Sequence, residues 1–401
     1  MVGVVVYGFS TEGYQIASSL ASQGFPVSMV DEEMQIATEI TPAVAKAIRT
    51  LPDLISRDQL LSIKPVEAAL SDAEYIFFAP KIRRYPEEAE REVNPRLREV
   101  AMNMMKGATL IYHLPSGLGG FETIVALVEK ISGLSSREGF EYVYAPLKPR
   151  TTEPYCLGFL SKPKKSLFNI FSKLGYKPFA LRCRAAEALH ASKILSTYST
   201  IAPQIEMYGL VEGSERVKLA RLLGGRDVFI DTLSSQLLDL KLIVTTLPPK
   251  EPLMHLASNI LKTVEGFSKK ILEEVRSLMK NLELKASKTK VILNWSVDKY
   301  EMRGDRLSVH QTLLERLRDY VSDVSTTSSA LWDGSSLEFK IKEIVSEPRV
   351  KLVISGSQTD HEALWERLNK ERPLGECIFI KANLICETLS TKTTRLSGEH
   401  V

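Results

Sequence analysis

A glycine turn between two short β-branched runs constrains the fold of this chain more than any other feature of its sequence. The stretch VVVYGFSTEGYQIASSLASQGFPVSMVDEE extends from Val4 to Glu33. It passes from a β-branched run through a helix-length amphipathic segment to a second β-branched run. This order predicts a strand, a tight turn, a helix and a parallel strand, which together form a βαβ unit.

The turn from Gly8 to Gly13 matches the dinucleotide-binding pattern G-x-G-x-x-G at its first and third glycines. The first glycine allows a tight turn, and the third lets the helix pack closely on the strand. Ser10 stands where the middle glycine lets the backbone approach a pyrophosphate, although its hydroxyl can itself donate to a phosphate. The turn therefore predicts a Rossmann-like domain, with nucleotide binding left open.

Two acids near the turn have opposite implications for a nucleotide. Glu12 lies at the start of the predicted helix, where its carboxylate satisfies the positive end of the helix dipole and repels a phosphate. Asp31 follows the second strand, where an acid accepts a hydrogen bond from a ribose 2′-hydroxyl and repels a 2′-phosphate. The sequence thus favours NAD over NADP, and the alternative of a turn kept only for folding stays open.

Strand and helix patterns alternate along the chain and are separated by a helical middle. Predicted strands are Val2–Tyr7, Val27–Val30, Tyr75–Ala79, Thr109–Tyr112, Tyr142–Ala145, Gly158–Leu160, Lys177–Leu181, Val291–Trp295, Lys351–Ser355 and Cys377–Lys381. Predicted helices are Gly13–Gln23, Glu87–Met105, Phe121–Ile131, Lys164–Leu174, Ala185–Glu212, Ser214–Leu223, Leu233–Val244, Leu256–Leu284, Val309–Tyr320 and His361–Lys370. The first strands are hydrophobic throughout, as in a buried parallel sheet.

At 401 residues the chain is too long for one ordinary core. We predict an α/β protein with three domains. These are an N-terminal Rossmann-like, doubly wound dinucleotide-binding domain (1–183), a central helical dimerisation domain (184–288) and a smaller C-terminal α/β domain (289–401). The long, apolar central helix Ala185–Glu212 predicts a homodimer.

Composition limits the classes of partner. The 44% hydrophobic and 25% charged residues are typical of a globular protein. The net charge of +3 is small for this length, so we expect the chain to bind neither nucleic acid nor a membrane. Its four cysteines are scattered, with no spacing typical of a metal site. We therefore expect reduced thiols, a cytoplasmic location and no metal.

Later landmarks follow one another in an order similar to that of the UDP-glucose/GDP-mannose (nucleotide-sugar) dehydrogenases. The matching segments are SDAEYIFFAPK (Ser71–Lys81), KGATLIYHLPSGLGG (Lys106–Gly120), YVYAPLKP (Tyr142–Pro149), the central helix Ala185–Glu212, and two C-terminal segments, Lys290–Leu317 and Arg349–Leu368. The resemblance covers nearly the whole chain and implies that the C-terminal domain is similar to the family's nucleotide-sugar-binding domain.

The resemblance also implies a chemistry and a set of site residues. Active members of the family oxidise the sugar C6 alcohol to a carboxylate in two NAD-dependent steps through a cysteine thioester, which requires a nucleophilic thiolate. By this resemblance the cofactor site would comprise Gly8, Phe9, Ser10, Gly13, Asp31, Pro80 and Pro115. The residues assigned to substrate binding are Glu187, Arg303 and Arg306.

The family's reacting groups are largely replaced. Its P-E-R glutamate falls on Leu147, and in the motif A-E-x-x-K-x-x-x-N the lysine falls on His190 and the asparagine on Ile194. Leucine and isoleucine can neither stabilise an oxyanion nor move a proton. The family's P-K-D segment falls on TTLPPKEP, where Lys250 could stand for the lysine, and the chain has no cysteine between Cys183 and Cys377.

Three functions remain open. The first is a divergent relative that has lost the two-step oxidation and acts as a nucleotide-binding or partner-binding protein. The second is an NAD-dependent oxidoreductase of the 6-phosphogluconate-dehydrogenase-like group that makes one hydride transfer, with His190, Lys193 and Lys250 as candidate polar groups. In this second hypothesis His190 and Lys250 would be the catalytic residues. The third is a structural protein whose dimer surface is its function.

Overall fold

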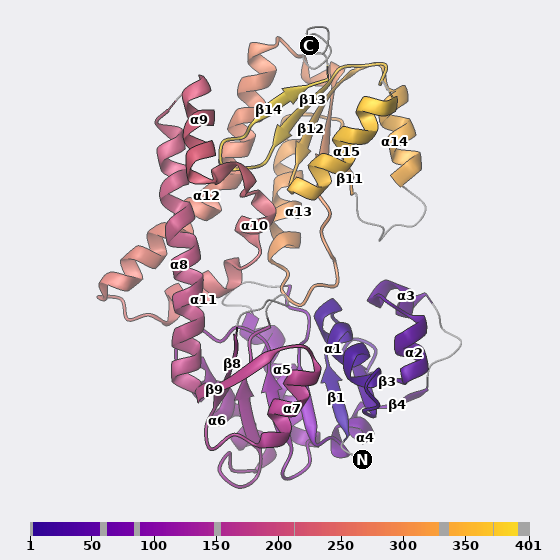
Figure 1. Ribbon diagram of the computed structural model, residues 1–401, viewed down its shortest axis with the longest axis vertical. Helices are drawn as coiled ribbons and strands as arrows, with labels where there is room; N and C mark the ends of the chain where they lie inside the picture. The colour runs from indigo at the N-terminus through magenta and orange to yellow at the C-terminus, as the bar shows by residue number, and fades with distance from the viewer. Residues whose placement is uncertain are drawn as a thin grey trace. The chain divides into compact units, whose positions relative to one another are not determined.

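The computed structural model describes residues 3–56, 62–83, 89–147, 154–211, 213–328, 337–371 and 373–391 (Figure 1). The chain divides into two compact units. Unit 1 comprises Met1–Leu195, Leu238–His255 and Lys299–Gly304, and unit 2 comprises Ser196–Leu237, Leu256–Asp298 and Asp305–Val401. Each unit contains its own sheet, and the predicted α/β class is confirmed.

Unit 1 is built on a nine-stranded sheet with the order β4-β3-β2-β1-β5-β6-β7-β8-β9. Its strands are β1 (Val4–Tyr7), β2 (Val27–Asp31), β3 (Ile36–Ile40), β4 (Ile63–Pro65), β5 (Tyr75–Phe78), β6 (Thr109–Tyr112), β7 (Glu141–Tyr144), β8 (Pro154–Phe159) and β9 (Lys177–Arg182). The strands from β2 through β1, β5 and β6 to β7 are parallel. The outer pairs β2–β3, β3–β4 and β7–β8 are antiparallel, whereas β8 and β9 are parallel.

Helices cover both faces of this sheet. They are α1 (Thr11–Ala21), α2 (Pro42–Ala47), α3 (Leu51–Ile55), α4 (Val66–Ser71), α5 (Ala89–Asn103), α6 (Gly120–Ser132) and α7 (Lys165–Lys173). On one face, the ring of Tyr7 stacks on Phe78, which stacks on Tyr112, with centroids 5.5 Å apart in each pair. On the other face Phe77 contacts Phe171 of α7, 6.1 Å between ring centroids. Every residue of β1, β5, β6 and β7 is buried, which explains why these strands are hydrophobic except for Thr109 and Glu141 at the starts of β6 and β7.

Unit 2 contains a five-stranded sheet with the order β11-β10-β12-β13-β14. Its strands are β10 (Thr289–Asn294), β11 (Val324–Thr327), β12 (Val350–Ser355), β13 (Cys377–Lys381) and the antiparallel β14 (Thr388–Ser390). Figure 1 shows helices α13 (Asp305–Arg318), α14 (Leu337–Ser346) and α15 (Gln358–Glu371) beside these strands. In both units the first strand, β1 or β10, has parallel neighbours on its two sides, so that the strand order reverses there. Such a switch point is where open α/β sheets bind ligands.

The remaining helices belong to the stretch between the two sheets in sequence. They are α8 (Cys183–Gly209), α9 (Gly213–Leu223), η1 (Gly225–Asp227), α10 (Ile230–Ser234), α11 (Leu237–Thr246), α12 (Pro252–Asn281) and η2 (Ala286–Lys288). None of the helices within the described ranges combines the length and the hydropathy of a membrane span. The three predicted domains, with boundaries at residues 183 and 288, stay a prediction.

Several sequence expectations need correction. The helix expected at Leu233–Val244 is two helices, α10 and α11, and the strand expected at Gly158–Leu160 begins at Pro154. Elements between Ile36 and Ser71 were not predicted, because they are short and lack a clear period; β11, α14 and β14 were missed for the same reason. Val2, Glu87 and Glu212, placed at the ends of predicted elements, lie outside the described residues.

Candidate functional site

The glycine turn after β1 has the tight geometry that its sequence predicts. Gly8 has φ +126°, and a Cβ there would lie 2.4 Å from the backbone of Pro80, which follows β5. A Cβ on Gly13 would lie 2.9 Å from the carbonyl oxygen of Gly8 and from Oγ of Ser10. Both glycines are therefore required by the close packing of β1, β5 and α1.

Ser10 is the N-terminal cap of α1. Its Oγ accepts a hydrogen bond from the backbone N–H of Gly13 at 3.1 Å. Its hydroxyl proton is donated to the carbonyl oxygen of Ala79 at 2.7 Å. Because a hydroxyl has one proton, this serine has none left for a phosphate.

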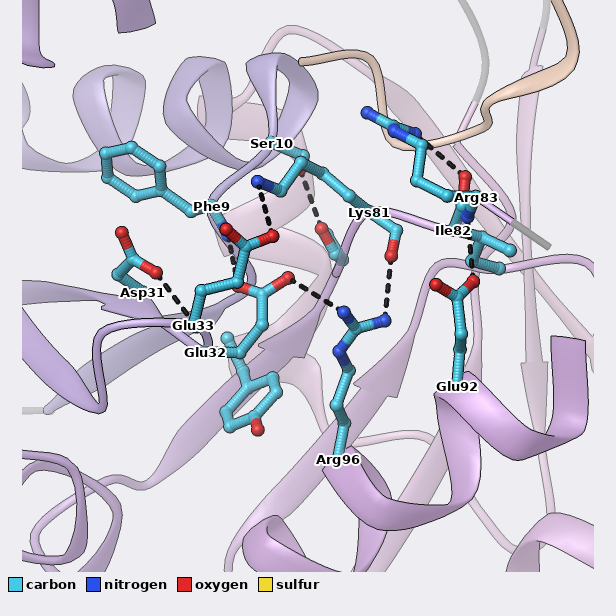
Figure 2. A network of polar contacts seen from close by, with 12 residues as sticks. Phe9, Ser10, Asp31, Glu32, Glu33, Lys81, Ile82, Arg83, Glu92 and Arg96 are labelled. Carbon is cyan, nitrogen blue, oxygen red and sulfur yellow. Dashed lines mark hydrogen bonds and ion pairs between the residues drawn. The ribbon is translucent and has the colours of Figure 1, made fainter. Parts of the chain in front are cut away.

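The backbone N–H of Phe9 donates to a side chain of the protein itself. Its acceptor is Oε2 of Glu32, 2.8 Å away, on the turn that follows β2 (Figure 2). The Glu32 side chain is 2% exposed, and its second oxygen lies 3.8 Å from Nη2 of Arg96 on α5. A buried carboxylate thus occupies the position in front of this N–H.

Lys299–Gly304, which we call the strap, lies against the start of α1 although it is distant in sequence. The carbonyl oxygen of Tyr300 accepts from the N–H of Thr11 at 2.9 Å, and the N–H of Met302 donates to Oε2 of Glu12 at 2.7 Å. The carbonyl oxygen of Met302 also accepts from the N–H of Ile82 at 2.8 Å.

Arg83 fastens the strap further. Its guanidinium donates to the carbonyl oxygens of Lys299 and Glu301, at 2.6 and 3.0 Å. Figure 2 shows the backbone N–H of Arg83 held by Glu92 of α5 (2.7 Å). The strap is therefore held by the start of α1 and by the segment that follows β5.

Asp31, the expected ribose acid, lies at the end of β2 and closes the turn to β3. Its Oδ1 accepts from the N–H groups of Glu33 (2.9 Å) and Met34 (3.1 Å). Glu33 in turn pairs with Lys81 at 3.2 Å. The ribose role of Asp31 stays a prediction, and one of its oxygens is already used.

These contacts test whether the turn suits the diphosphate of a dinucleotide. The N–H groups of Phe9, Thr11 and Gly13 would face the anion, and each already has an acceptor within the protein. Glu12 and Glu32 add two carboxylates at the same place, which repel a phosphate. In this arrangement the residues of the turn do not fit a diphosphate.

A second polar group in unit 1 is centred on His190 of α8. Nε2 of His190 lies 2.5 Å from Oδ1 of Asp239 on α11, and Nε of Arg303 in the strap lies 3.5 Å from the other oxygen. His190 and Asp239 are buried. Nδ1 of His190 has no hydrogen-bond partner among the described residues, and the ring of Tyr144 meets the imidazole edge-on at 6.3 Å.

The charges of this group are set by their surroundings. Burial alone raises the pKa of Asp239, but the charge of Arg303 and the hydrogen bond from His190 outweigh it, so the pKa lies below its ordinary value. An ionised carboxylate only accepts hydrogen bonds, so Nε2 of His190 carries the proton. In the neutral ring Nδ1 is then the basic nitrogen.

Glu187, the expected substrate ligand, lies one turn before His190 on α8 and caps α6. Its carboxylate accepts from the N–H groups of Gly119 (2.7 Å) and Phe121 (2.9 Å) and from the hydroxyl of Ser116 (2.7 Å). Burial raises its pKa, against the lowering effect of these donors. Three donors already use this carboxylate, and its role in substrate binding stays a prediction.

The other predicted site residues are less concentrated. Lys250 is exposed on the turn between α11 and α12 and makes no hydrogen bond or ion pair with a described residue. Arg306 of unit 2 pairs with Asp231 at 3.3 Å. Pro115 is buried and lines a cavity of about 460 Å³ between α5, α6 and α11 of unit 1. None of the described residues that line this cavity is charged.

Two positions at which the resemblance places reacting groups of the family are apolar. Leu147 and Ile194 are 7% and 2% exposed. Burial raises the pKa of the thiols of Cys183 to about 12, of Cys377 to about 11 and of Cys386 to about 12. Cys156 is half-buried in β8. Lys148, next to Leu147, lies outside the described residues.

Sequence reasoning missed Glu32, Asp239 and most of the strap. Glu32 had a signal, because it extends an acidic run after β2. Asp239 had one too, as an acid in the hydrophobic run LLDLKLIV. The strap had none, because its contacts join residues far apart in the chain.

No protein-family model matches the chain, and no curated protein matches it in sequence. Among solved structures, the UDP-D-ManNAc dehydrogenase of Pyrococcus horikoshii is similar, with a TM-score of 0.63 and 18% identity over 96% of each chain. The UDP-glucose dehydrogenase of Pyrobaculum islandicum gives a TM-score of 0.62 and 15% identity over 96% of this chain and 94% of that one. The UDP-N-acetyl-mannosamine dehydrogenase Cap5O of Staphylococcus aureus gives a TM-score of 0.62 and 13% identity. The match covers 91% of this chain and 92% of that one. This chain has the fold of these sugar-nucleotide dehydrogenases.

Proposed function

We propose that this chain is a non-oxidising protein with the nucleotide-sugar dehydrogenase fold, and that it acts by binding a partner. The observation that carries the proposal is the state of its thiols. Cys183, Cys377 and Cys386 are buried with raised pKa values, and so hold little thiolate at neutral pH. These three thiols are therefore poorly suited to capture an aldehyde as a thiohemiacetal for oxidation to a thioester, and the chain has no cysteine between Cys183 and Cys377, where the resemblance places the family's nucleophile.

The groups that would assist this chemistry are missing as well. Leu147 and Ile194, at the positions of the family's glutamate and asparagine, are buried and cannot hydrogen-bond an oxyanion. When catalytic residues act as a unit, losing one of them can reduce the rate almost as much as losing all of them. The loss of several supports a protein that keeps the scaffold without the two-step oxidation.

The partner that we propose is a second copy of the chain. Around the end of α8 and along α9, Leu210 is 78% exposed, Leu222 is 84% exposed and Met207 is 51% exposed. Exposed large apolar side chains concentrated in one stretch of the chain favour an interaction surface there. A homodimer through this region is consistent with the length of α8, which has 27 residues.

The oxidation is tested directly with the purified chain. NAD is added with UDP-glucose, GDP-mannose or UDP-N-acetylmannosamine, and the absorbance of NADH is followed. No NADH forms if the proposal is right. Formation of NADH together with the uronic acid would refute it.

A second candidate function rests on the His190–Asp239 pair. A carboxylate that holds the protonated Nε2 leaves Nδ1 as a base, which is the arrangement needed to remove a proton from an alcohol during one hydride transfer. This candidate needs NAD, whose binding stays a prediction. Its test is turnover of NAD with simple hydroxy acids and polyols, compared between His190→Gln and the exposed control His255→Gln. Equal rates in both variants would exclude His190 as the base.

A cytoplasmic location and reduced thiols remain proposals based on the scattered cysteines. The described thiols of Cys183 and Cys386 are free and buried. The mass of the protein purified from its native host without reductant would show whether its thiols are reduced. An intermolecular disulfide would contradict the proposal.

A further inference from the structure

The two α/β units share a feature at their switch points that their sequences do not reveal. In unit 1, β1 ends at Tyr7, and the N–H two residues later, of Phe9, donates to Oε2 of Glu32 at 2.8 Å. In unit 2, β10 ends at Asn294, and the N–H two residues later, of Ser296, donates to Oδ2 of Asp360 at 2.9 Å. Equivalent backbone donors therefore meet a buried carboxylate in both units.

Each acid follows a strand that pairs with the first strand, although the two strands do not correspond in chain order. Glu32 follows β2, a parallel neighbour of β1, and Asp360 follows β12, a parallel neighbour of β10. Glu32 is 8% exposed and Asp360 is 1% exposed. Each carboxylate thus ties the first strand of its sheet to the segment that follows a parallel neighbour, at the carboxyl edge where such sheets bind ligands.

The donors around each carboxylate form a built anion site. Asp360 accepts from the N–H and hydroxyl of Ser296 and from the hydroxyl of Ser357 (2.6 Å), and it lies in the first turn of α15, where the helix dipole favours negative charge. Glu32 accepts from Phe9 and lies 3.8 Å from the guanidinium of Arg96. Both groups of donors suit an anion, and in each the anion is a carboxylate of the protein itself.

We infer that Glu32 and Asp360 are the resident anions of two sites, one at the switch point of each unit, and that nucleotide phosphates are excluded from both. A phosphate at either site would have to displace a buried carboxylate from its donors and lie beside its charge. In unit 1 it would also have to break the hydrogen bonds that the strap makes to Thr11 and Glu12. The inference goes beyond the proposed function, which concerns the oxidation chemistry only.

Chemical rescue tests the inference on the full-length chain. Glu32→Ala and Asp360→Ala each empty one site while keeping its backbone donors. We expect both variants to have a lower Tm than the unchanged protein, and formate or acetate to recover part of the loss as its concentration rises, compared with chloride at equal ionic strength. The matched controls are Glu33→Ala, which removes an exposed acid next to Glu32, and Glu366→Ala, which removes an exposed acid of α15, the helix that carries Asp360. They should show no specific response to formate.

The unchanged protein gives a second measurement, which stands even if a variant does not fold. Millimolar NAD, UDP or inorganic phosphate should not raise its Tm. A rise with any of them, or density for a phosphate at the N–H of Phe9 or Ser296 in a soaked crystal, would overturn the inference. So would Glu32→Ala and Asp360→Ala proteins that respond to formate no more than their controls. Nucleotide binding without formation of NADH would overturn this inference and leave the proposed loss of oxidation intact.

Discussion

Nε2 of His190 and Oδ1 of Asp239 lie 2.5 Å apart, although 49 residues separate them and they belong to different helices. The pair is buried, and Arg303 of the strap lies 3.5 Å from the second oxygen of Asp239. One carboxylate thus balances an imidazole N–H and a guanidinium. The strap is thereby linked electrostatically to α11, and the orientation of the imidazole is fixed.

Replacing Asp239 with Asn should destabilise the protein. The variant leaves Arg303 without its buried counter-charge, and breaking a buried pair in this way costs about 3 kcal/mol. The pKa of Asp239 is lowered in the folded state, so its contribution is present above the unfolded value of 3.8 and is lost as the pH falls below it. The difference in Tm between the two proteins should therefore be large at neutral pH and shrink as the pH falls below 3.8 and through the lowered pKa of Asp239.

Asp319→Asn is the control for this pH series, because Asp319 is exposed at the end of α13. Its Tm should follow that of the unchanged protein at every pH. An Asp239→Asn protein as stable as the unchanged one at neutral pH would show that the ion pair contributes nothing.

Much of the fold could be predicted from local sequence, because a buried strand and an amphipathic helix each have a period of their own. The predicted strands Thr109–Tyr112 and Cys377–Lys381 agree with β6 and β13 at both ends. The predicted Val27–Val30 misses only the last residue of β2. These segments are mostly hydrophobic because the sheet buries both of their faces.

The candidate site was much less predictable, because its contacts depend on topology. Glu32 reaches Phe9 only because β2 lies beside β1 in the sheet. Met302 reaches Glu12 across 290 residues. Hydrophobic periodicity does not encode such pairs. The sequence therefore indicated that the glycine turn departs from the dinucleotide-binding pattern, but not that Glu32 and the strap accept hydrogen bonds from its N–H groups.

Gly8→Ala should be far more harmful than Gly24→Ala, although both glycines have positive φ angles, +126° and +85°. A methyl group on Gly8 would lie 2.4 Å from the backbone of Pro80, whereas one on Gly24 has no heavy atom within 4 Å. We expect Gly24→Ala to cost about 1 kcal/mol and Gly8→Ala at least about 3 kcal/mol. Urea unfolding of both variants measures this. Similar losses would mean that β1 and β5 move apart easily.

Thiol alkylation should be slow and selective in the folded protein. Cys183, Cys377 and Cys386 are buried and their pKa values are raised, so little thiolate is present at mildly alkaline pH. Cys156, half-buried in β8, should react first with iodoacetamide. Peptide mass spectrometry over time, with the urea-unfolded chain as the reference, gives the order. Rapid labelling of Cys183 in the native protein would contradict its burial and revive a thiol-based reaction.

Leu222→Glu should weaken the proposed homodimer. Leu222, near the end of α9, is 84% exposed, so a charge there leaves the core of unit 2 untouched but disfavours burial against a second chain. Leu374→Glu is the matched control, because Leu374 is 75% exposed in the same unit and lies before β13, away in sequence from α8 and α9. Light scattering over a dilution series should give the mass of two chains for the unchanged protein and for the control. The Leu222→Glu protein should dissociate at higher concentration than either. A mass of one chain for the unchanged protein at all concentrations, or equal dissociation of both variants, would remove α9 as the interface.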